Sequence, residues 1–138
     1  MIRLLMVNKV YIIDDDDISL FLSSLVLEES GFAAKVLTYT SADSALRQLS
    51  DSNHTDLPEV ILLDLNMPGK NGWDFLETLR QCEQKFQGRT SIFILTSSIA
   101  ASDKARSKNY RLVQGFLHKP LDDESLDFIR QAHRASNR

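Results

Sequence analysis

The sequence predicts an α/β fold in which one open parallel sheet is covered by helices on both faces. Three observations indicate this class. Short runs of branched and aromatic residues recur along the chain, segments with helical periodicity separate them, and most of the short runs are apolar throughout. Strands buried on both faces have this composition, and strands that alternate with helices pair in parallel through right-handed crossovers.

Five segments have the length and composition of strands. In chain order they are residues 10–13, 34–40, 60–63, 92–95 and 116–117. The second segment mixes polar and apolar residues, which favours an edge position, whereas the other four are typical of strands with both faces covered.

Five helices are expected after these strands. The first carries an apolar stripe with the spacing of one helical face, and Gly31 would end it. The members of this stripe are Ile18, Phe21, Leu22, Leu25 and Val26. The helix that follows Gly72 carries a similar stripe, which runs from Phe75 to Phe86.

The last expected helix combines an apolar stripe with a favourable charge pattern. Leu126, Ile129 and Ala132 lie on one face, acidic residues stand at the start and arginines near the end, which suits the helix dipole. Weaker patterns predict the second and fourth helices at residues 42–49 and 101–108. Strand and helix thus alternate five times along the chain.

Length and composition indicate one ordinary domain. The chain has 138 residues, 43% hydrophobic and 25% charged, with a net charge of −3. Such a chain can bury a core without cross-links, and its charge gives no general attraction to nucleic acid or to a membrane surface. Residues 1–8 are expected to form a short N-terminal extension and residues 9–138 the domain. Cys82 is the only cysteine, which suits a reducing compartment.

Polar residues follow four of the five expected strands. Asp14 to Asp17 follow the first, Asp64 the third, Thr96 to Ser98 the fourth, and Lys119 with Pro120 the fifth. Because ligands of such sheets bind beyond the carboxyl ends of the strands, we expect these side chains to share one site. Carboxylates suit Mg²⁺, and a lysine and a hydroxyl can hold phosphoryl oxygens. A carboxylate in such a site can act as a nucleophile toward phosphorus.

Together these residues resemble the receiver domain of two-component response regulators, of the chemotaxis type with a single domain. The resemblance covers residues 9–133 and rests on the acidic pair Asp14-Asp15, the pattern Asp64-x-x-Met67-Pro68-x-x-x-Gly72, Thr96, and Lys119-Pro120. It implies a flavodoxin-like, doubly wound, five-stranded sheet with strand order 2-1-3-4-5 and five helices. It also implies a cis peptide bond before Pro120.

The resemblance implies a role for each site residue. Asp64 would be the phosphoacceptor. Mg²⁺ would be bound directly by Asp15, through water by Asp14, by Asp64 itself and by the backbone carbonyl of Asn66. Thr96 would bond the phosphoryl group once it is attached, and Lys119 would pair with that group or with Asp64.

Phe116 stands where the family often has an aromatic residue that swings inward as the threonine moves. Because Phe116 lacks a hydroxyl, any such switch in this chain would be steric. An aromatic residue in a strand is equally well explained as ordinary core.

The implied function is that of a cytoplasmic response regulator with a single domain. It would take a phosphoryl group from a histidine kinase or a His-containing phosphotransfer protein. It would then signal to an unknown downstream protein through the face formed by the fourth helix, the fifth strand and the fifth helix. It would be an acceptor that loses its phosphoryl group by itself, and not an enzyme with turnover.

The sequence bears on four alternatives to this function. A relay intermediate would pass the phosphoryl group on to a His phosphotransfer protein. A phosphatase of the haloacid dehalogenase type has a second Asp two residues after its nucleophile, where this chain has Asn66. A nucleotide-binding domain would carry a G-x-G-x-x-G or P-loop motif, and neither is present. A degenerate receiver that serves only as a scaffold would lack part of the site.

Overall fold

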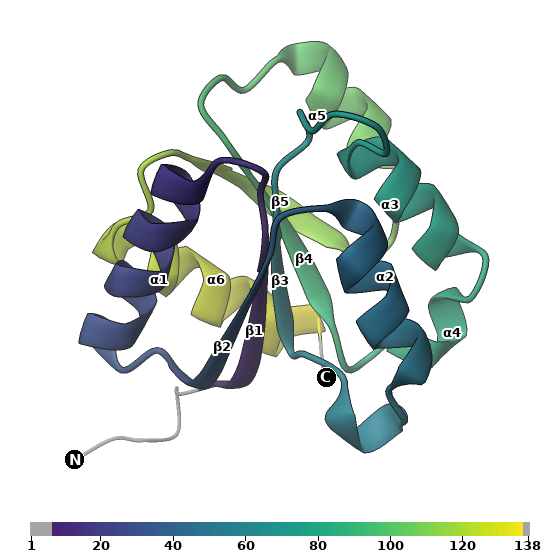
Figure 1. Ribbon diagram of the computed structural model, residues 1–138, viewed down its shortest axis with the longest axis horizontal. Coiled ribbons are helices and arrows are strands. Elements are labelled where there is room, and N and C mark those ends of the chain that lie inside the picture. The colour runs from purple at the N-terminus through teal and green to yellow at the C-terminus, as the bar shows by residue number, and fades with distance from the viewer. Residues whose placement is uncertain (1–6, 137–138) are drawn as a thin grey trace.

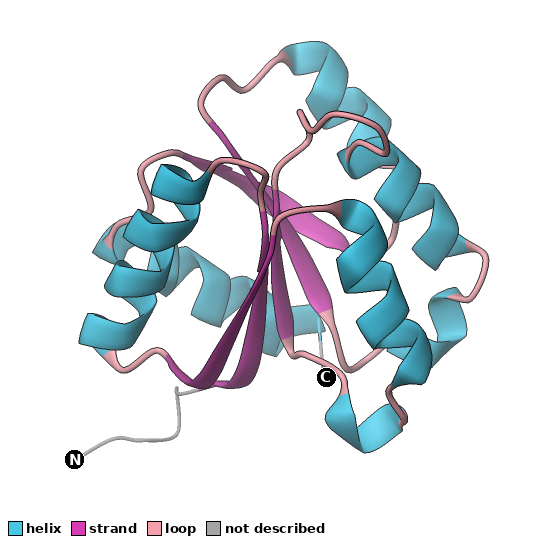
Figure 2. Ribbon diagram, in the orientation of Figure 1, coloured by secondary structure: helices cyan, strands magenta, loops and turns pink. Residues whose placement is uncertain are grey.

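A five-stranded parallel sheet forms the centre of the protein, with helices on both of its faces (Figures 1 and 2). This computed structural model describes residues 7–136. The strands are β1 (Val7–Ile13), β2 (Ala33–Tyr39), β3 (Val60–Leu63), β4 (Ser91–Thr96) and β5 (Val113–His118). Their order across the sheet is β2-β1-β3-β4-β5, which confirms the predicted fold class and strand order.

The helices divide into two layers. Helices α1 (Asp17–Ser30) and α6 (Asp123–Ser136) cover one face, as Figure 1 shows. The other face is covered by α2 (Ala42–Asp51), α3 (Gly72–Arg80), α4 (Glu83–Phe86) and α5 (Ala101–Ser107), and a 3₁₀ turn, η1 (His54–Asp56), precedes β3. Within residues 7–136, none of these helices combines the length and the apolarity needed to cross a bilayer.

Each face of the sheet has its own apolar core. Successive residues of a strand point to opposite faces, so that β1 contributes Val10 and Ile12 to one core and Tyr11 and Ile13 to the other. The first core is completed by α1 and α6, and the second by α2, α3 and α4. Burial on both faces explains why the interior strands are apolar throughout.

The first strand begins earlier than the sequence analysis expected. Val7 pairs with Ala33 of β2, and its N–H donates to the carbonyl of Phe32 over 2.9 Å. The N–H of Asn8 donates to Oε2 of Glu59 over 2.7 Å. Val7 and Asn8 therefore belong to the sheet and not to an extension, and residues 1–6 lie outside the described part of the chain.

The stripe from Phe75 to Phe86 forms two helices where one was expected, so the described chain has six α-helices. Helix α3 ends at Arg80 with Gln81 as its C-cap, and Cys82 has φ −131° and ψ 39°, which is not helical. The break lets α4 bury Phe86 in the core under α2. The ammonium of Lys85 then donates to the carbonyl of Leu49 at the end of α2 over 2.8 Å. Periodicity alone does not reveal such a break, because the apolar spacing continues across it.

Four of the five members of the apolar stripe of α1 are exposed, and only Val26 packs against the core. Ile18 is 72% exposed, Phe21 65% and Leu22 48%. The core is instead contacted by Leu20 and Leu27, which lie two turns apart on the other side. Because α1 has apolar residues around most of its circumference, its periodicity fits more than one buried face.

A buried polar network joins α6 to the sheet at the amino end of the strands. His133 Nδ1 is hydrogen-bonded to the hydroxyl of Ser91 in β4 at 2.7 Å, and His133 Nε2 to Oε1 of Glu59 at 3.2 Å. The Ser91 hydroxyl also lies 2.9 Å from that of Ser136. Buried polar groups of this kind stabilise a fold only when they are paired, so His133 has a structural role here.

Replacing His133 with alanine is expected to lower the free energy of unfolding by roughly 2–3 kcal/mol. The change leaves a cavity and removes one of the two partners of the buried Ser91 hydroxyl. Urea unfolding followed by circular dichroism measures the effect. His54→Ala, at an exposed position, serves as the control and should stay within about 0.5 kcal/mol of the wild type. Equal losses in the two variants would contradict the structural role of His133.

Candidate functional site

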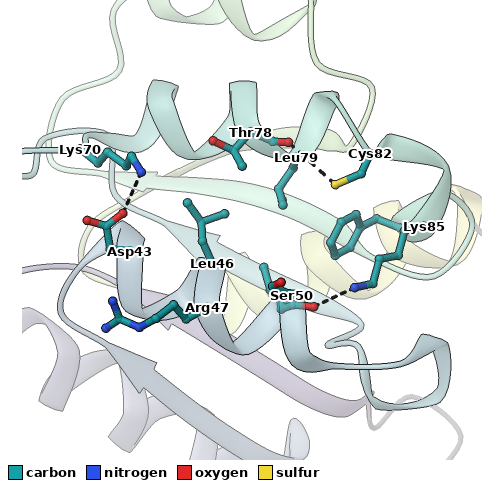
Figure 3. Close-up of a pocket in the computed structure, with 11 residues that line it drawn as sticks. Asp43, Leu46, Arg47, Ser50, Lys70, Thr78, Leu79, Cys82 and Lys85 are labelled. Atoms are coloured by element: carbon teal, nitrogen blue, oxygen red, sulfur yellow. Dashed lines mark hydrogen bonds and ion pairs between the residues drawn. The ribbon is translucent and has the colours of Figure 1, made fainter.

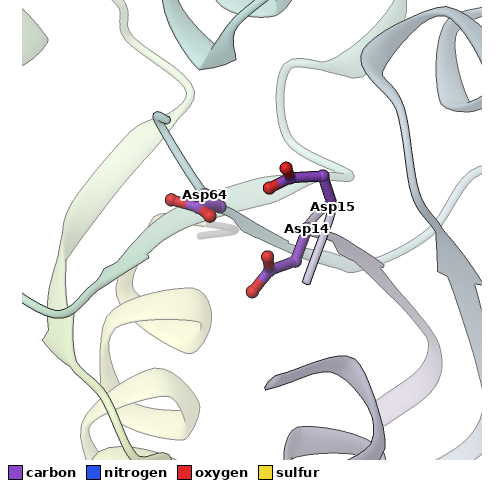
Figure 4. A group of neighbouring side chains, drawn as sticks. All are labelled: Asp14, Asp15 and Asp64. Carbon is purple, nitrogen blue, oxygen red and sulfur yellow. The ribbon is translucent and has the colours of Figure 1, made fainter. Parts of the chain in front are cut away.

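Three carboxylates meet at the carboxyl end of the sheet (Figure 4). Asp14 and Asp15 follow β1, and Asp64 follows β3. One carboxylate oxygen from each lies within 4.8 Å of those of the other two. The neighbouring strands place them there, since Ile13 pairs with Leu63 and the N–H of Asp64 donates to the carbonyl of Ile13 over 2.9 Å.

Lys119 reaches this acidic cluster from the loop after β5. Its ammonium lies 2.7 Å from Oδ2 of Asp14 and 3.6 Å from Oδ2 of Asp64. Its backbone N–H donates to the carbonyl of Thr96 over 2.7 Å, which fixes the start of the loop against β4. The peptide bond between Lys119 and Pro120 is cis, as predicted.

Local turns orient the two buried acids. Oδ1 of Asp14 accepts the N–H of Asp16 over 3.0 Å, and Oδ1 of Asp64 accepts the N–H of Asn66 over 3.1 Å. In each acid the second oxygen, Oδ2, is therefore the one that faces Lys119. The expected contribution of the Asn66 carbonyl to metal binding stays a prediction.

Gly72 occupies its position because no side chain fits there. A Cβ at this residue would lie 2.7 Å from the carbonyl oxygen of Asp64 and 2.8 Å from Cα of Leu65. Its N–H donates to the carbonyl of Leu65 over 3.0 Å. The glycine of the sequence motif thus lets helix α3 start against the loop that carries Asp64.

Thr96 and Phe116 lie at different distances from the strand ends. Thr96 is the last residue of β4 and is buried, and its hydroxyl donates to the carbonyl of Ser98 over 3.1 Å and accepts the N–H of Ser98 over 3.2 Å. Phe116 pairs in register with Ile94, two residues before Thr96. Its partly buried ring packs on the core, so the structure does not bring it to the carboxylates.

Burial and charge shift three pKa values in the cluster. Burial raises the pKa of Asp64, the nearby Asp14 carboxylate adds to this, and the N–H of Asn66 and the Lys119 ammonium offset it only in part. Burial would also raise the pKa of Asp14, but hydrogen bonds from Lys119 and Ser19 hold it below its usual value. Burial would lower the pKa of Lys119, yet the two carboxylates raise it above its usual value. Asp64 is therefore the less well compensated of the two buried acids.

The chemistry of these donors fits a hard divalent cation such as Mg²⁺. Three carboxylates offer oxygen ligands within a small space, and Mg²⁺ prefers oxygen. Two of the three are buried, and one lysine faces both of these. A further positive charge would offset both the burial and the repulsion from Asp14 that raise the pKa of Asp64.

Two features beside the site were missed in the sequence. Ser19, whose side chain helps to lower the pKa of Asp14, lies in the first turn of α1 and belongs to no recognised pattern. The exposed stripe of α1 forms, together with Lys119, Pro120 and Leu121, a cavity of about 410 Å³ that includes Ile18 and Leu22. The stripe itself is visible in the sequence, but its spacing does not reveal whether the sheet or solvent faces it.

Comparisons with known proteins agree with the geometry. Residues 10–129 match the family model of the response regulator receiver domain. The transcriptional regulatory protein CpxR of Escherichia coli is 33% identical over 119 residues, 86% of this chain and 46% of that protein. Hybrid signal transduction histidine kinase C of Dictyostelium discoideum is 28% identical over 126 residues, 88% of this chain and 10% of that protein. The chain thus spans less than half the length of these two relatives.

A solved structure extends the similarity to three dimensions. The crystal structure of a two component response regulator from Cytophaga hutchinsonii superposes with a TM-score of 0.86 at 26% sequence identity. The superposition covers 94% of this chain and 98% of that one. The family match and the shared fold favour a receiver over the phosphatase and the nucleotide-binding domain considered above.

Replacing Asp64 with asparagine is expected to stabilise the metal-free protein at neutral pH by roughly 1 kcal/mol. The folded state raises the pKa of Asp64, so folding disfavours its carboxylate. The advantage of the variant should therefore be complete above that raised pKa and should shrink as the pH falls through it. Thermal unfolding in EDTA at several pH values measures this trend. Asp43→Asn is the control, because Lys70 lowers the pKa of exposed Asp43 and the variant should show no such increase.

Proposed function

The chain belongs to the response regulator receiver family, and on this premise we propose that Asp64 accepts a phosphoryl group from a histidine kinase or a His-containing phosphotransfer protein. One observation carries the proposal. Asp64 lies at a strand end with Asp14 and Asp15 within 4.8 Å and with the Lys119 ammonium 3.6 Å from its Oδ2. The site thus combines a nucleophile, oxygen ligands for a metal and a cation for the phosphoryl oxygens.

The transfer follows from these positions. An oxygen of Asp64 forms a bond to phosphorus while the phosphorus–nitrogen bond of a phosphohistidine breaks, which leaves an acyl phosphate on Asp64. Asp14, Asp15, Asp64 and the carbonyl of Asn66 would hold Mg²⁺, whose charge offsets the negative charge that gathers on the phosphoryl oxygens. The Lys119 ammonium exchanges its carboxylate partner for a phosphoryl oxygen.

Thr96 is proposed to transmit the modification. To bond the phosphoryl group, its hydroxyl gives up its hydrogen bonds to the carbonyl and the N–H of Ser98. The loop that moves with it carries Ile99, a half-exposed side chain in a cavity of about 550 Å³ lined also by Phe116 and Phe128. This cavity lies on the face of α5, β5 and α6, the proposed output surface. Phosphorylation would shift the balance between two arrangements of this loop.

The exposed stripe of α1 is proposed to dock the phosphoryl donor. Ile18, Phe21, Leu22 and Leu25 are exposed apolar side chains on the helix that starts just after Asp15. A contiguous apolar patch of this kind marks a protein contact, and an apolar helix face packs best against other helices. A donor that presents its histidine on a helical bundle could therefore seat it beside Asp64.

The proposal describes a carrier of a phosphoryl group that also loses it by itself, and not an enzyme with turnover. A cytoplasmic location fits its single free cysteine, Cys82, and a kinase partner that works in a reducing compartment. We also propose that the protein acts as a single domain. Its downstream partner would be a protein, whose identity is unknown. The similarity to a hybrid histidine kinase favours one further candidate, a relay intermediate that passes the phosphoryl group to a phosphotransfer protein.

Incubation with acetyl phosphate and Mg²⁺ is expected to add one phosphoryl group to the wild-type protein. The adduct should be stable in acid and labile in base, as an acyl phosphate is, and intact-mass spectrometry with a mobility-shift gel detects it. Asp64→Asn should remove it, and Asp15→Ala should reduce labelling at least about 100-fold because a metal ligand is lost. Undiminished labelling of Asp64→Asn would refute the assignment of the phosphoacceptor. Labelling that persists without metal would refute the assignment of Asp15.

Replacing Phe21 with serine is expected to slow phosphotransfer from the cognate kinase by about ten-fold or more, since a central apolar contact of a docking surface is lost. Labelling by acetyl phosphate should be unchanged, because the small donor needs no docking. Phosphotransfer profiling against candidate kinases supplies the donor for the assay. Glu28→Gln, an exposed polar position of the same helix, is the control and should transfer at the wild-type rate. Equal rates for Phe21→Ser and the control would exclude this stripe as the docking surface.

A further inference from the structure

A groove between α2, α3 and α4 lies apart from both the carboxylates and the proposed output face (Figure 3). Its volume is about 510 Å³, which is within the usual range for small-molecule sites. The groove exists because the chain breaks its helix at Cys82, so that α4 turns back toward α2. It is therefore a consequence of the tertiary structure of this chain.

The floor of the groove is apolar. Leu49, Leu79 and Phe86 are almost wholly buried and form its base, and the partly buried Leu46 points into it from α2. These side chains belong to the core on this side of the sheet, which holds the floor in place. An apolar ligand group would find a preformed surface here.

The rim of the groove is mostly cationic. Arg47, Lys70 and Lys85 stand around it, with Asp43 as the one acid among its lining residues. Asp43 is paired with Lys70 at 2.9 Å, and Lys85 donates to the carbonyl of Leu49. Within residues 7–136, the exposed guanidinium of Arg47 has no hydrogen bond or ion pair, although its charge acts on nearby Asp43, and it stands at the Lys70 end of the groove.

We propose that this groove binds a small amphiphilic anion, an apolar chain or ring that carries a carboxylate. The apolar part lies on Leu46, Leu79 and Phe86, and the carboxylate lies at the end of the groove formed by Arg47 and Lys70. The excess of positive charge on the rim selects an anion over a cation of the same shape. This site is independent of phosphorylation and of the function proposed for Asp64.

Titration of the full chain with sodium decanoate below its micellar range tests the site. Backbone amide signals of α2, α3 and α4 should shift in two-dimensional nitrogen–proton spectra, with a dissociation constant of about 1 mM, as expected for a ligand of this size. Decylammonium chloride, which has the same chain and the opposite charge, should bind at least about three-fold more weakly.

Matched variants localise the binding. Ser50→Trp places a large ring in the groove and should abolish the shifts, whereas Gln48→Trp, an exposed position of the same helix outside the groove, should retain them. Arg47→Gln should weaken decanoate about three-fold, and Arg89→Gln, an exposed position elsewhere, should not. Leu46→Gln provides a second test of the apolar floor if Ser50→Trp disturbs the fold.

Three results would overturn the proposal. They are equal binding of decanoate and decylammonium, wild-type affinity in both Ser50→Trp and Leu46→Gln, and shifts confined to the exposed stripe of α1. None of them bears on the labelling of Asp64 by acetyl phosphate, so the two proposals fail separately.

Discussion

Two buried carboxylates, Asp14 and Asp64, lie next to each other at the end of the sheet and share one lysine. Their proximity follows directly from the pairing of β1 with β3, so the fold cannot form without bringing the two charges together. Burial raises the pKa of Asp64, and Lys119, which lies closer to Asp14, offsets this only in part. A site with unbalanced negative charge is suited to take up a cation and then a phosphoryl group.

Lys119, which faces these two acids, is connected by hydrogen bonds to the loop after β4. The N–H of Lys119 donates a hydrogen bond to the carbonyl of Thr96, and the hydroxyl of Thr96 is hydrogen-bonded to the carbonyl and the N–H of Ser98. Helix α5, which follows this loop, is held on α3 by the guanidinium of Arg106, 4.4 Å from the ring of Trp73. A change at the carboxylates therefore has a short path of physical contacts to the proposed output face.

The helices are where sequence and structure diverge. The stripe of α1 has the spacing of one helical face, the face that would cover a sheet, yet Phe21 and Leu22 face solvent and Leu20 and Leu27 contact the sheet. Hydrophobic periodicity measures the apolarity of a face and not what covers it, so a helix with two apolar faces is ambiguous. The continuous stripe from Phe75 to Phe86 likewise concealed the break that creates α4 and the groove beside it.

The sequence by itself determined the α/β class, the five strands and the meeting of Asp14, Asp15, Asp64 and Lys119, because these four residues follow apolar runs that are strands in their own right. Only the tertiary structure decided which oxygen of each acid faces Lys119, why Gly72 tolerates no side chain, and which face of α1 is exposed. These features depend on distances between segments far apart in the chain. Local residue patterns do not determine these distances, because the distances are set only when the helices pack on the sheet.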